Sequence, residues 1–398
     1  MMRDVLAWLF ALALLAPSST RPQTLPSANY QVPSTRNDGW STAHADSVGV
    51  DASRLAAMTE TIRAAPELNV HAILIERDGK LIYEEYFNGE DEHWGRRLGK
   101  VSMTMETRHD LRSVTKSVVS ALVGIARGEG AIQSLDQPLI AWFPEFPELD
   151  NPEHRRVTLA HALSMTAGFE WNEEIPSTDP RNDEIRMTRN SQPLRYVLSR
   201  SLVTDPGRDF KYNGGLPQVM AAVVQRATKT PFQAYARAKL FDPLGITDVE
   251  WVGSLGDLPS AASGLRLRSR DLAKIGSLYL HDGQWNGKQV IPAEWIDLST
   301  RRHVQFQAPP GAKGEFGYGY FWWYGCGPAH AGLTEARIAI GNGGQRIFVY
   351  QGLKTAVTVM AGRYNDPSVA PLIRKLVADF VLPAVKTDIR TGCPGAAP

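Results

Sequence analysis

Cysteine and net charge are both scarce in this sequence. Its 398 residues include two cysteines, Cys326 and Cys393, and 43 basic residues against 42 acidic ones. A formal net charge of +1 gives no electrostatic reason to expect nucleic acid as a partner. Two cysteines without a histidine cluster beside them do not make a zinc site, so we expect neither a metal nor a cofactor.

The signatures of other enzyme classes are missing as well. No Gly-x-Ser-x-Gly elbow occurs, which argues against an α/β-hydrolase. The nine histidines are scattered and form no His-Glu-x-x-His motif. The apolar run from Val5 to Ala16 is too short for a comfortable membrane span.

The N-terminus nevertheless has the pattern of an export signal, because a basic residue precedes that apolar run and small residues follow it. We expect residues 1–22 to be a signal peptide and the protein to be periplasmic or secreted. A retained N-terminal anchor is the alternative. Residues 23–48 are expected to be irregular. Export into oxidising conditions favours a Cys326–Cys393 disulfide over two unpaired thiols.

Strand and helix patterns divide the rest of the chain into β-rich ends and a helical middle. A helix over Val50 to Ala64 precedes two β-rich runs joined by Asp78-Gly79, a hairpin signal. Near the other end, three strands and a closing helix are predicted over 336–340, 346–350, 356–360 and 371–380. We predict an α+β fold: an antiparallel sheet built from both chain ends, flanked by helices, with an inserted and mostly helical region.

A serine and a lysine three residues apart stand at the start of this middle region. Ser113-Val114-Thr115-Lys116 is the only Ser-x-x-Lys in the chain, and on a helix this spacing puts both side chains on one face. A lysine beside a serine hydroxyl can act as its base. The apolar residues that follow would take Lys116 out of water, which lowers a lysine pKa and frees the neutral amine. The alternative is a capping serine and a surface lysine.

Two further segments could complete such a site. Tyr212 precedes the helical run Leu216 to Ala227 and could relay a proton; the alternative is a loop tyrosine on the surface. Gly341-Asn342-Gly343-Gly344-Gln345 precedes a strand, and its glycines let backbone approach a substrate closely. The N–H groups of Ser113 and of this strand edge would form an oxyanion hole, whereas the alternative is a plain hairpin turn.

Three weaker candidates lie elsewhere. Asp183 and Glu184 belong to a charged segment that could line the site or could simply be solvated, and we favour the second interpretation. Trp322, Trp323 and Tyr324 could wall an apolar acyl pocket or belong to the core. His161 lies on a predicted core helix and is expected to be structural.

In this order, the motifs resemble those of the serine β-lactamase and penicillin-binding-protein superfamily. Further stretches are similar to segments of its class C-type branch of esterases, D-aminopeptidases and 6-aminohexanoate-dimer hydrolases: 157–168, 263–273, 285–288 and 317–323. The resemblance covers about 50–385 and implies a β-lactamase/transpeptidase-like fold. It implies one catalytic domain over 49–390, with an α/β part at about 49–110 and 310–390 and a helical part at about 111–309.

The resemblance also implies roles for matching residues. Ser113 would be the acylated nucleophile, and Lys116 and Tyr212 would share the general base and acid work. Asn342-Gly343-Gly344 would occupy the place of the family's Lys-Thr-Gly triplet. The Gln345 N–H would then join that of Ser113 in the oxyanion hole.

Two positions depart from the family's pattern. The residue two after Tyr212 is Gly214 where the family commonly has asparagine, and Asn213 comes one place early. The amide that steadies the lysine is therefore missing or comes from elsewhere. Asn342 stands where β-lactamases carry a cation that would engage a substrate carboxylate. This argues against efficient β-lactam hydrolysis and for an ester or amide substrate without that carboxylate.

These observations predict an exported serine hydrolase that cleaves an ester or amide bond through an acyl-enzyme on Ser113, with Lys116 deprotonating the serine. Its substrate would be a small ester or amide, or a compound derived from the cell wall, and the oligomeric state stays open. One alternative is a DD-peptidase or weak β-lactamase acting on peptidoglycan-related substrates. Another is a non-catalytic binding or sensor protein on the same fold.

Overall fold

The computed structural model describes residues 30–386, except 177–178, 307–314 and 330–331. The predicted signal peptide and Cys393 lie outside these residues, and with Cys393 so does the predicted disulfide. Within the described part of the chain, no helix is both long and apolar enough to span a bilayer.

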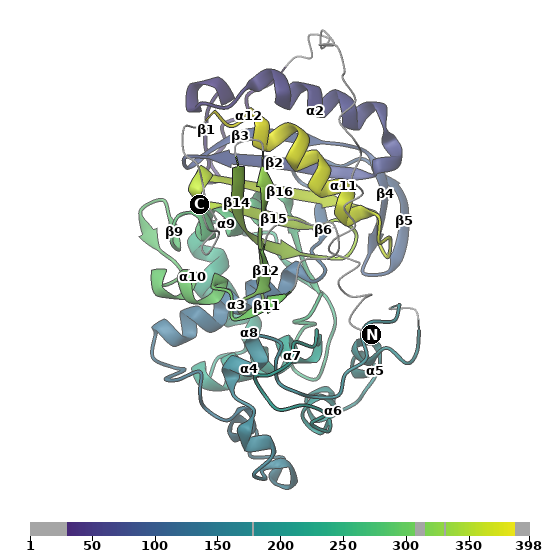
Figure 1. The fold of residues 1–398 in the computed structure, drawn as a ribbon, viewed down its shortest axis with the longest axis vertical. Coiled ribbons are helices and arrows are strands. Elements are labelled where there is room, and N and C mark those ends of the chain that lie inside the picture. The colour runs from purple at the N-terminus through teal and green to yellow at the C-terminus, as the bar shows by residue number, and fades with distance from the viewer. Residues whose placement is uncertain (1–29, 177–178, 307–314, 330–331, 387–398) are drawn as a thin grey trace.

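A nine-stranded sheet forms the centre of the molecule (Figure 1). In spatial order its strands are β1 (Ser41–Thr42), β3 (Lys80–Tyr86), β2 (Val70–Arg77), β16 (Thr355–Ala361), β15 (Arg346–Tyr350), β14 (Gly332–Ile340), β13 (Trp323–Ala329), β12 (Glu315–Tyr318) and β11 (Val304–Phe306). The two chain ends meet where β2 pairs with β16. All neighbours are antiparallel except β1 and β3. The predicted antiparallel sheet from both chain ends is confirmed, with one parallel edge.

Helices from the two ends of the chain cover one face of this sheet. They are α2 (Ala52–Ala64) and α11 (Val369–Leu376), the latter continuing through Val377–Val381 into α12 (Leu382–Ala384). Asp51 begins α2, because its carboxylate accepts a hydrogen bond from the Ser53 N–H at 2.9 Å. The apolar faces of these helices share one core cluster with β2, β3, β15 and β16, so both predicted terminal helices are confirmed.

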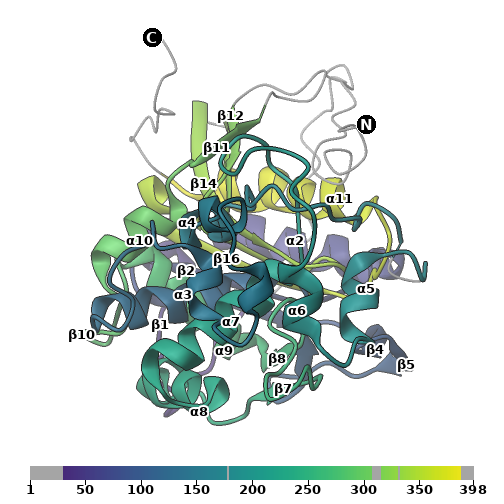
Figure 2. The same ribbon diagram turned by 90° about the horizontal axis from the view of Figure 1, so that it is seen from below.

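The inserted helical region covers the opposite face. Helix α9 (Ser269–Leu280) packs against β15, β16 and β2, and α3 (Val114–Gly128) packs against α7 (Gly215–Thr228). Figure 2 shows the same region from below. Its remaining helices are α4 (Leu159–Leu163), α5 (Asp183–Thr188), α6 (Pro193–Leu198), α8 (Phe232–Ala236) and α10 (Ala293–Thr300). Helix α3 is buried from Val114 to Ala126, so it lies inside the molecule rather than on its surface.

Three small sheets that the sequence did not predict complete the fold. They are the hairpin of β4 (Gly89–His93) with β5 (Arg96–Val101), the hairpin of β9 (Gln284–Trp285) with β10 (Lys288–Gln289), and β6 (Arg108–Asp110) with β8 (Leu265–Arg268) and β7 (Glu250–Trp251). Strand β6 ends three residues before Ser113, so the pairing of β6 with β8 positions the start of α3.

The contact between α3 and α10 is tight enough to test. A Cβ atom on Gly124 would lie 2.1 Å from Cγ of Trp295. We expect Gly124→Ala to lower the free energy of unfolding by about 1–3 kcal/mol, because the added methyl overpacks a filled core. Urea unfolding measures this. Gly325→Ala is the control, since its Cβ would meet only Ile338 Cδ1 at 3.4 Å. Equal midpoints for the two variants would contradict the tight packing.

Candidate active site

Ser113 lies directly before α3, and its side chain does not cap the helix. It occupies the N-cap position, yet its Oγ makes no capping hydrogen bond. Arg112, the residue before it, has a φ of 49°, a left-handed conformation that costs a non-glycine residue about 1–3 kcal/mol. The Arg112 guanidinium is held by Asp110 at 3.2 Å and lies 4.7 Å from the centre of the Tyr364 ring. These contacts hold the turn that presents Ser113.

Lys116 is buried beside that serine. Its side chain is 1 % exposed, and Nζ donates to Ser113 Oγ at 2.9 Å and to the Ala262 carbonyl at 3.0 Å. Nζ also lies 4.9 Å from the centre of the Tyr212 ring. The structure thus brings all three predicted residues together, and the interpretation of Lys116 as a surface lysine is wrong.

Tyr212 closes this group from the loop before α7. Its hydroxyl interacts with Ser113 and Lys116, and its ring stacks on Trp323 with 6.1 Å between centroids. Burial raises the pKa of Tyr212, although the charge of Lys116 and these interactions of the hydroxyl oppose this. Tyr212 therefore rests as a neutral phenol and can donate a proton.

Two carboxyl groups occupy the place of the missing asparagine side chain. A Cβ on Gly214 would lie 3.0 Å from Oε2 of Glu173 and 3.2 Å from Cδ of Glu184. Glu173 accepts hydrogen bonds from the Gly214 N–H at 2.6 Å and the Trp171 Nε1–H at 2.8 Å. Glu184 accepts one from Ser263 at 3.1 Å. A side chain at position 214 would therefore require these carboxyl groups to shift.

Asn213 does not supply the missing amide. It is buried, and its Oδ1 accepts a hydrogen bond from the Gly215 N–H at 2.8 Å, at the start of α7. Sequence reasoning noticed Glu184 but favoured a solvated role for it, and it missed Glu173 entirely. The signal that could have found both is the glycine at 214, which leaves a space that another residue must fill.

These carboxyl groups set the charge of Lys116. Burial lowers the pKa of Lys116, but the negative charges of Tyr212 when ionised, Glu184 and Glu173 outweigh burial and raise it overall. The sequence-based expectation of a lowered lysine pKa is therefore wrong, because it considered desolvation alone. Burial, reinforced by Glu184, also raises the pKa of Glu173 to about 8, although Lys116 opposes this.

The glycine-rich segment lies against the backbone that leads to Ser113. A Cβ on Gly341 would come within 2.4 Å of the Leu111 carbonyl oxygen. Gly343 and Gly344 have φ values of 96° and 107°, which favour glycine. Gln345 is buried, and its side chain donates to the carbonyls of Asn342 and Ala361 and accepts from the Ala361 N–H, which fixes the backbone at this position.

The side chain of Asn342 is occupied. Its Nδ2 donates to Asn365 Oδ1 at 2.8 Å, and its Oδ1 accepts from the Asn365 N–H at 2.8 Å. A neutral amide held in this way cannot act as the cation that β-lactamases place there.

The weaker candidates separate clearly. Trp322 is buried against Tyr279, with 4.1 Å between centroids, so it belongs to the core, whereas Trp323 adjoins Tyr212. Asp183 is structural, because it accepts from the Asn172 N–H at 2.6 Å and pairs with Arg200. His161 is structural as predicted, because it forms a capping box at the start of α4.

The architecture and this group define a class before any individual relative is considered: a β-lactamase/transpeptidase-like fold. A family model described as "Beta-lactamase" matches residues 58–381, and the chain belongs to that family. The predicted resemblance is confirmed. The structure of a putative 6-aminohexanoate-dimer hydrolase from Bacillus anthracis has the same fold, with a TM-score of 0.63 at 20% identity over 80% of this chain and 81% of that one.

Curated relatives match part of the chain. Esterase EstB from Burkholderia gladioli is 32% identical over 51% of this chain and 52% of its own length. The 6-aminohexanoate-dimer hydrolase of Paenarthrobacter ureafaciens is 26% identical over 55% of this chain and 58% of its own. The chain therefore spans little more than half the length of these relatives. EstCE1, described as a hydrolase with promiscuous acyltransferase activity, shares the fold at a TM-score of 0.63, 17% identity, and coverage of 82% and 98%.

The raised pKa of Glu173 has a consequence for stability. Because the folded state holds this proton up to a pH of about 8, the Glu173 carboxyl destabilises the fold as pH rises from its ordinary pKa of 4.5 towards 8. We expect Glu173→Gln to gain melting temperature over the wild type at pH 8, and to gain less at pH 5. Thermal melts followed by circular dichroism at both pH values measure this.

Glu174→Gln is the matched control for that variant. Glu174 is the next residue in the chain, but it is exposed and pairs with Lys211 at 2.6 Å. A Glu173→Gln advantage that is the same at pH 5 and pH 8 would show that Glu173 is ionised in the folded protein throughout, contrary to this assignment.

Proposed function

We propose that the protein is a serine hydrolase that cleaves an ester or amide through an acyl-enzyme on Ser113. The observation that carries this proposal is the buried Lys116 ammonium 2.9 Å from an Oγ that caps no helix. The names of the relatives, an esterase and an amide hydrolase, agree with it. A binding or sensor protein would have no need to bury a lysine against a serine.

The chemistry begins from the form of the site that lacks one proton shared by Lys116 and Tyr212. Ser113 Oγ attacks the substrate carbonyl carbon while its proton passes to this pair. The N–H groups of Ser113 and Gln345 are the proposed donors to the carbonyl oxygen as it becomes negative. The same proton then goes from Tyr212 to the leaving oxygen or nitrogen as its bond to carbon breaks.

Water completes the cycle by reversing these transfers. It gives a proton to the Lys116–Tyr212 pair as its oxygen attacks the acyl carbon, and that proton returns to Ser113 Oγ when the acid leaves. The ammonium of Lys116 lies close enough to Tyr212 to stabilise the phenolate that carries the active form. No step requires a metal or a cofactor.

The surroundings favour an acyl group without a carboxylate. Asn342 is neutral and hydrogen-bonded to Asn365, and the side chain stacked on Tyr212 is the apolar ring of Trp323. A peptidoglycan-directed DD-peptidase or β-lactamase would need a cation that this segment does not offer. We also propose export to the periplasm or medium, which the basic, then apolar, then small-residue order of the N-terminus supports.

Replacing the nucleophile tests the proposal directly. We expect Ser113→Ala to lower the rate of p-nitrophenyl ester hydrolysis by about 10³-fold or more, and to abolish labelling by a fluorophosphonate probe. Ser120→Ala, a buried serine on the same helix, should keep both properties. Full activity in Ser113→Ala would refute the acyl-enzyme, and labelling of the wild type would argue against a non-catalytic protein.

The charge of Glu184 should appear in the pH profile. Its carboxylate raises the pKa of Lys116, so Glu184→Gln should lower that pKa. The limb of kcat/KM that rises with pH should then move to lower pH. Asp179→Asn is the control, because the Asp179 carboxylate pairs with Arg181. A limb that stays in place in Glu184→Gln would mean that it does not report the Lys116–Tyr212 pair.

A further inference from the structure

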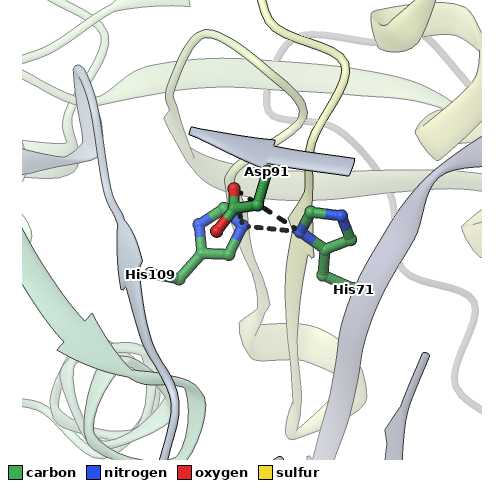
Figure 3. Close-up of side chains that lie close together, drawn as sticks. All are labelled: His71, Asp91 and His109. Atoms are coloured by element: carbon green, nitrogen blue, oxygen red, sulfur yellow. Dashed lines mark hydrogen bonds and ion pairs between the residues drawn. The ribbon is translucent and has the colours of Figure 1, made fainter. Parts of the chain in front are cut away.

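Three buried side chains from three separate sheets converge at the strand that leads to Ser113, apart from the proton network of that serine (Figure 3). His71 lies on β2 of the large sheet, Asp91 on the β4–β5 hairpin and His109 on β6. They are 0 %, 4 % and 2 % exposed. The proposed hydrolysis uses none of them, and their spacing along the chain matches no metal motif.

The distances between their inner atoms suit a small cation. His71 Nδ1 lies 2.8 Å from His109 Nε2, and the Asp91 Oδ1 lies 3.4 Å from His109 Nε2 and 3.9 Å from His71 Nδ1. In a tetrahedral zinc site, metal–ligand bonds of ~2.0–2.1 Å put the ligand atoms about 3.3 Å apart. The three observed distances lie on both sides of that value.

The outer nitrogen of His71 must carry a proton. His71 Nε2 lies 3.2 Å from Asn69 Oδ1. The orientation of that amide is fixed by the backbone of Glu90, because its Oδ1 accepts from the Glu90 N–H at 3.0 Å and its Nδ2 donates to the Glu90 carbonyl at 2.9 Å. An amide oxygen can only accept, so His71 Nε2 is the donor and Nδ1 of the neutral ring is bare.

The outer nitrogen of His109, Nδ1, must also carry a proton. Its Nδ1 lies 3.0 Å from the carbonyl oxygen of Asp110, which can only accept. His109 Nε2 is therefore also bare in the neutral ring. Two nitrogen lone pairs then face each other, and the nearby oxygen of Asp91 is a third acceptor, itself bonded by the Tyr364 hydroxyl at 3.0 Å. A proton shared between the two rings would satisfy the nitrogens, whereas a metal cation placed among these atoms would be bound by all three.

In both histidines, a hydrogen bond from the outer nitrogen fixes the tautomer and the direction of the ring. Histidines that bind metals make the same kind of hydrogen bond. The backbone also packs closely against the His71 ring. A Cβ on Gly89 would lie 2.7 Å from His71 Nε2, and one on Gly362 would lie 2.5 Å from His71 Cε1. The three side chains are at most 4 % exposed, so the site lies away from solvent and substrate.

We propose that His71 Nδ1, His109 Nε2 and Asp91 bind one divalent transition-metal ion, with Zn²⁺ as the best match to two imidazoles and a carboxylate. The ion would cross-link the large sheet, the β4–β5 hairpin and β6. Because β6 leads through Leu111 and Arg112 into Ser113, the ion would hold in place the backbone that presents the nucleophile. Its role is structural and does not depend on the proposed hydrolysis.

Reconstitution tests this on the full-length protein. After treatment with a chelator and dialysis, addition of ZnCl₂ should restore one zinc per chain by elemental analysis, and should raise the melting temperature by about 3 °C or more. Addition of Co²⁺ instead should give the visible absorption bands of a tetrahedral cobalt site. Ser113→Ala should respond in the same way, which separates this result from the catalytic proposal.

Variants distinguish this site from adventitious binding. Asp91→Asn keeps the shape of the site and His109→Gln removes one ligand, so both should lose the stoichiometric zinc, the cobalt bands and the thermal response. His93→Gln is the control, since its ring pairs with Glu250 at 3.0 Å, outside the site. Wild-type protein that takes up no stoichiometric metal and shows no thermal shift would overturn the proposal and leave a shared proton between the histidines. Equal losses in His93→Gln would overturn it too.

Discussion

The buried ammonium of Lys116 is the constraint on which the site depends. Removing such a charge from water costs several kcal/mol unless partners surround it. Helix α3 is buried around it and apolar, so the partners come from elsewhere: the Ala262 carbonyl, Tyr212 and the carboxyl groups of Glu173 and Glu184. Because these belong to separate segments of the inserted region, the lysine is stabilised only when the helices around α3 have assembled.

One departure from the family's pattern involves three positions in the sequence. The family's asparagine is lost at Gly214, and carboxyl groups from Glu173 and Glu184 fill the space it leaves. A neutral amide and a carboxylate differ in charge, and the charge of Glu184 raises the pKa of Lys116, so Lys116 stays protonated at rest. A charged Lys116 is a weak base, but it stabilises the Tyr212 phenolate. This moves the proton-accepting role in the proposed mechanism from the lysine towards the tyrosine.

Local sequence patterns predicted the features that are formed by residues close together in the chain. The Ser113–Lys116 pair follows from helical spacing, and the β2–β3 hairpin follows from Asp78-Gly79 between two β-rich runs. Contacts made only in the tertiary structure could not be read in this way. Glu173 acts on the charge of Lys116 from a loop that is distant in the sequence. His71 and Asp91 reach His109 because three sheets meet, although no spacing in the sequence marks them.

The chain from His109 to Ser113 joins the two clusters. Asp110 next to His109 pairs with Arg112, and the Arg112 guanidinium lies over the ring of Tyr364, whose hydroxyl bonds Asp91. The left-handed turn at Arg112 is therefore held from both sides by groups that surround the histidine pair. A strained residue persists only where its surroundings over-determine it. The proposed ion would make the backbone before Ser113, the proposed nucleophile, rigid, whereas Lys116 and the carboxyl groups set the charge around it.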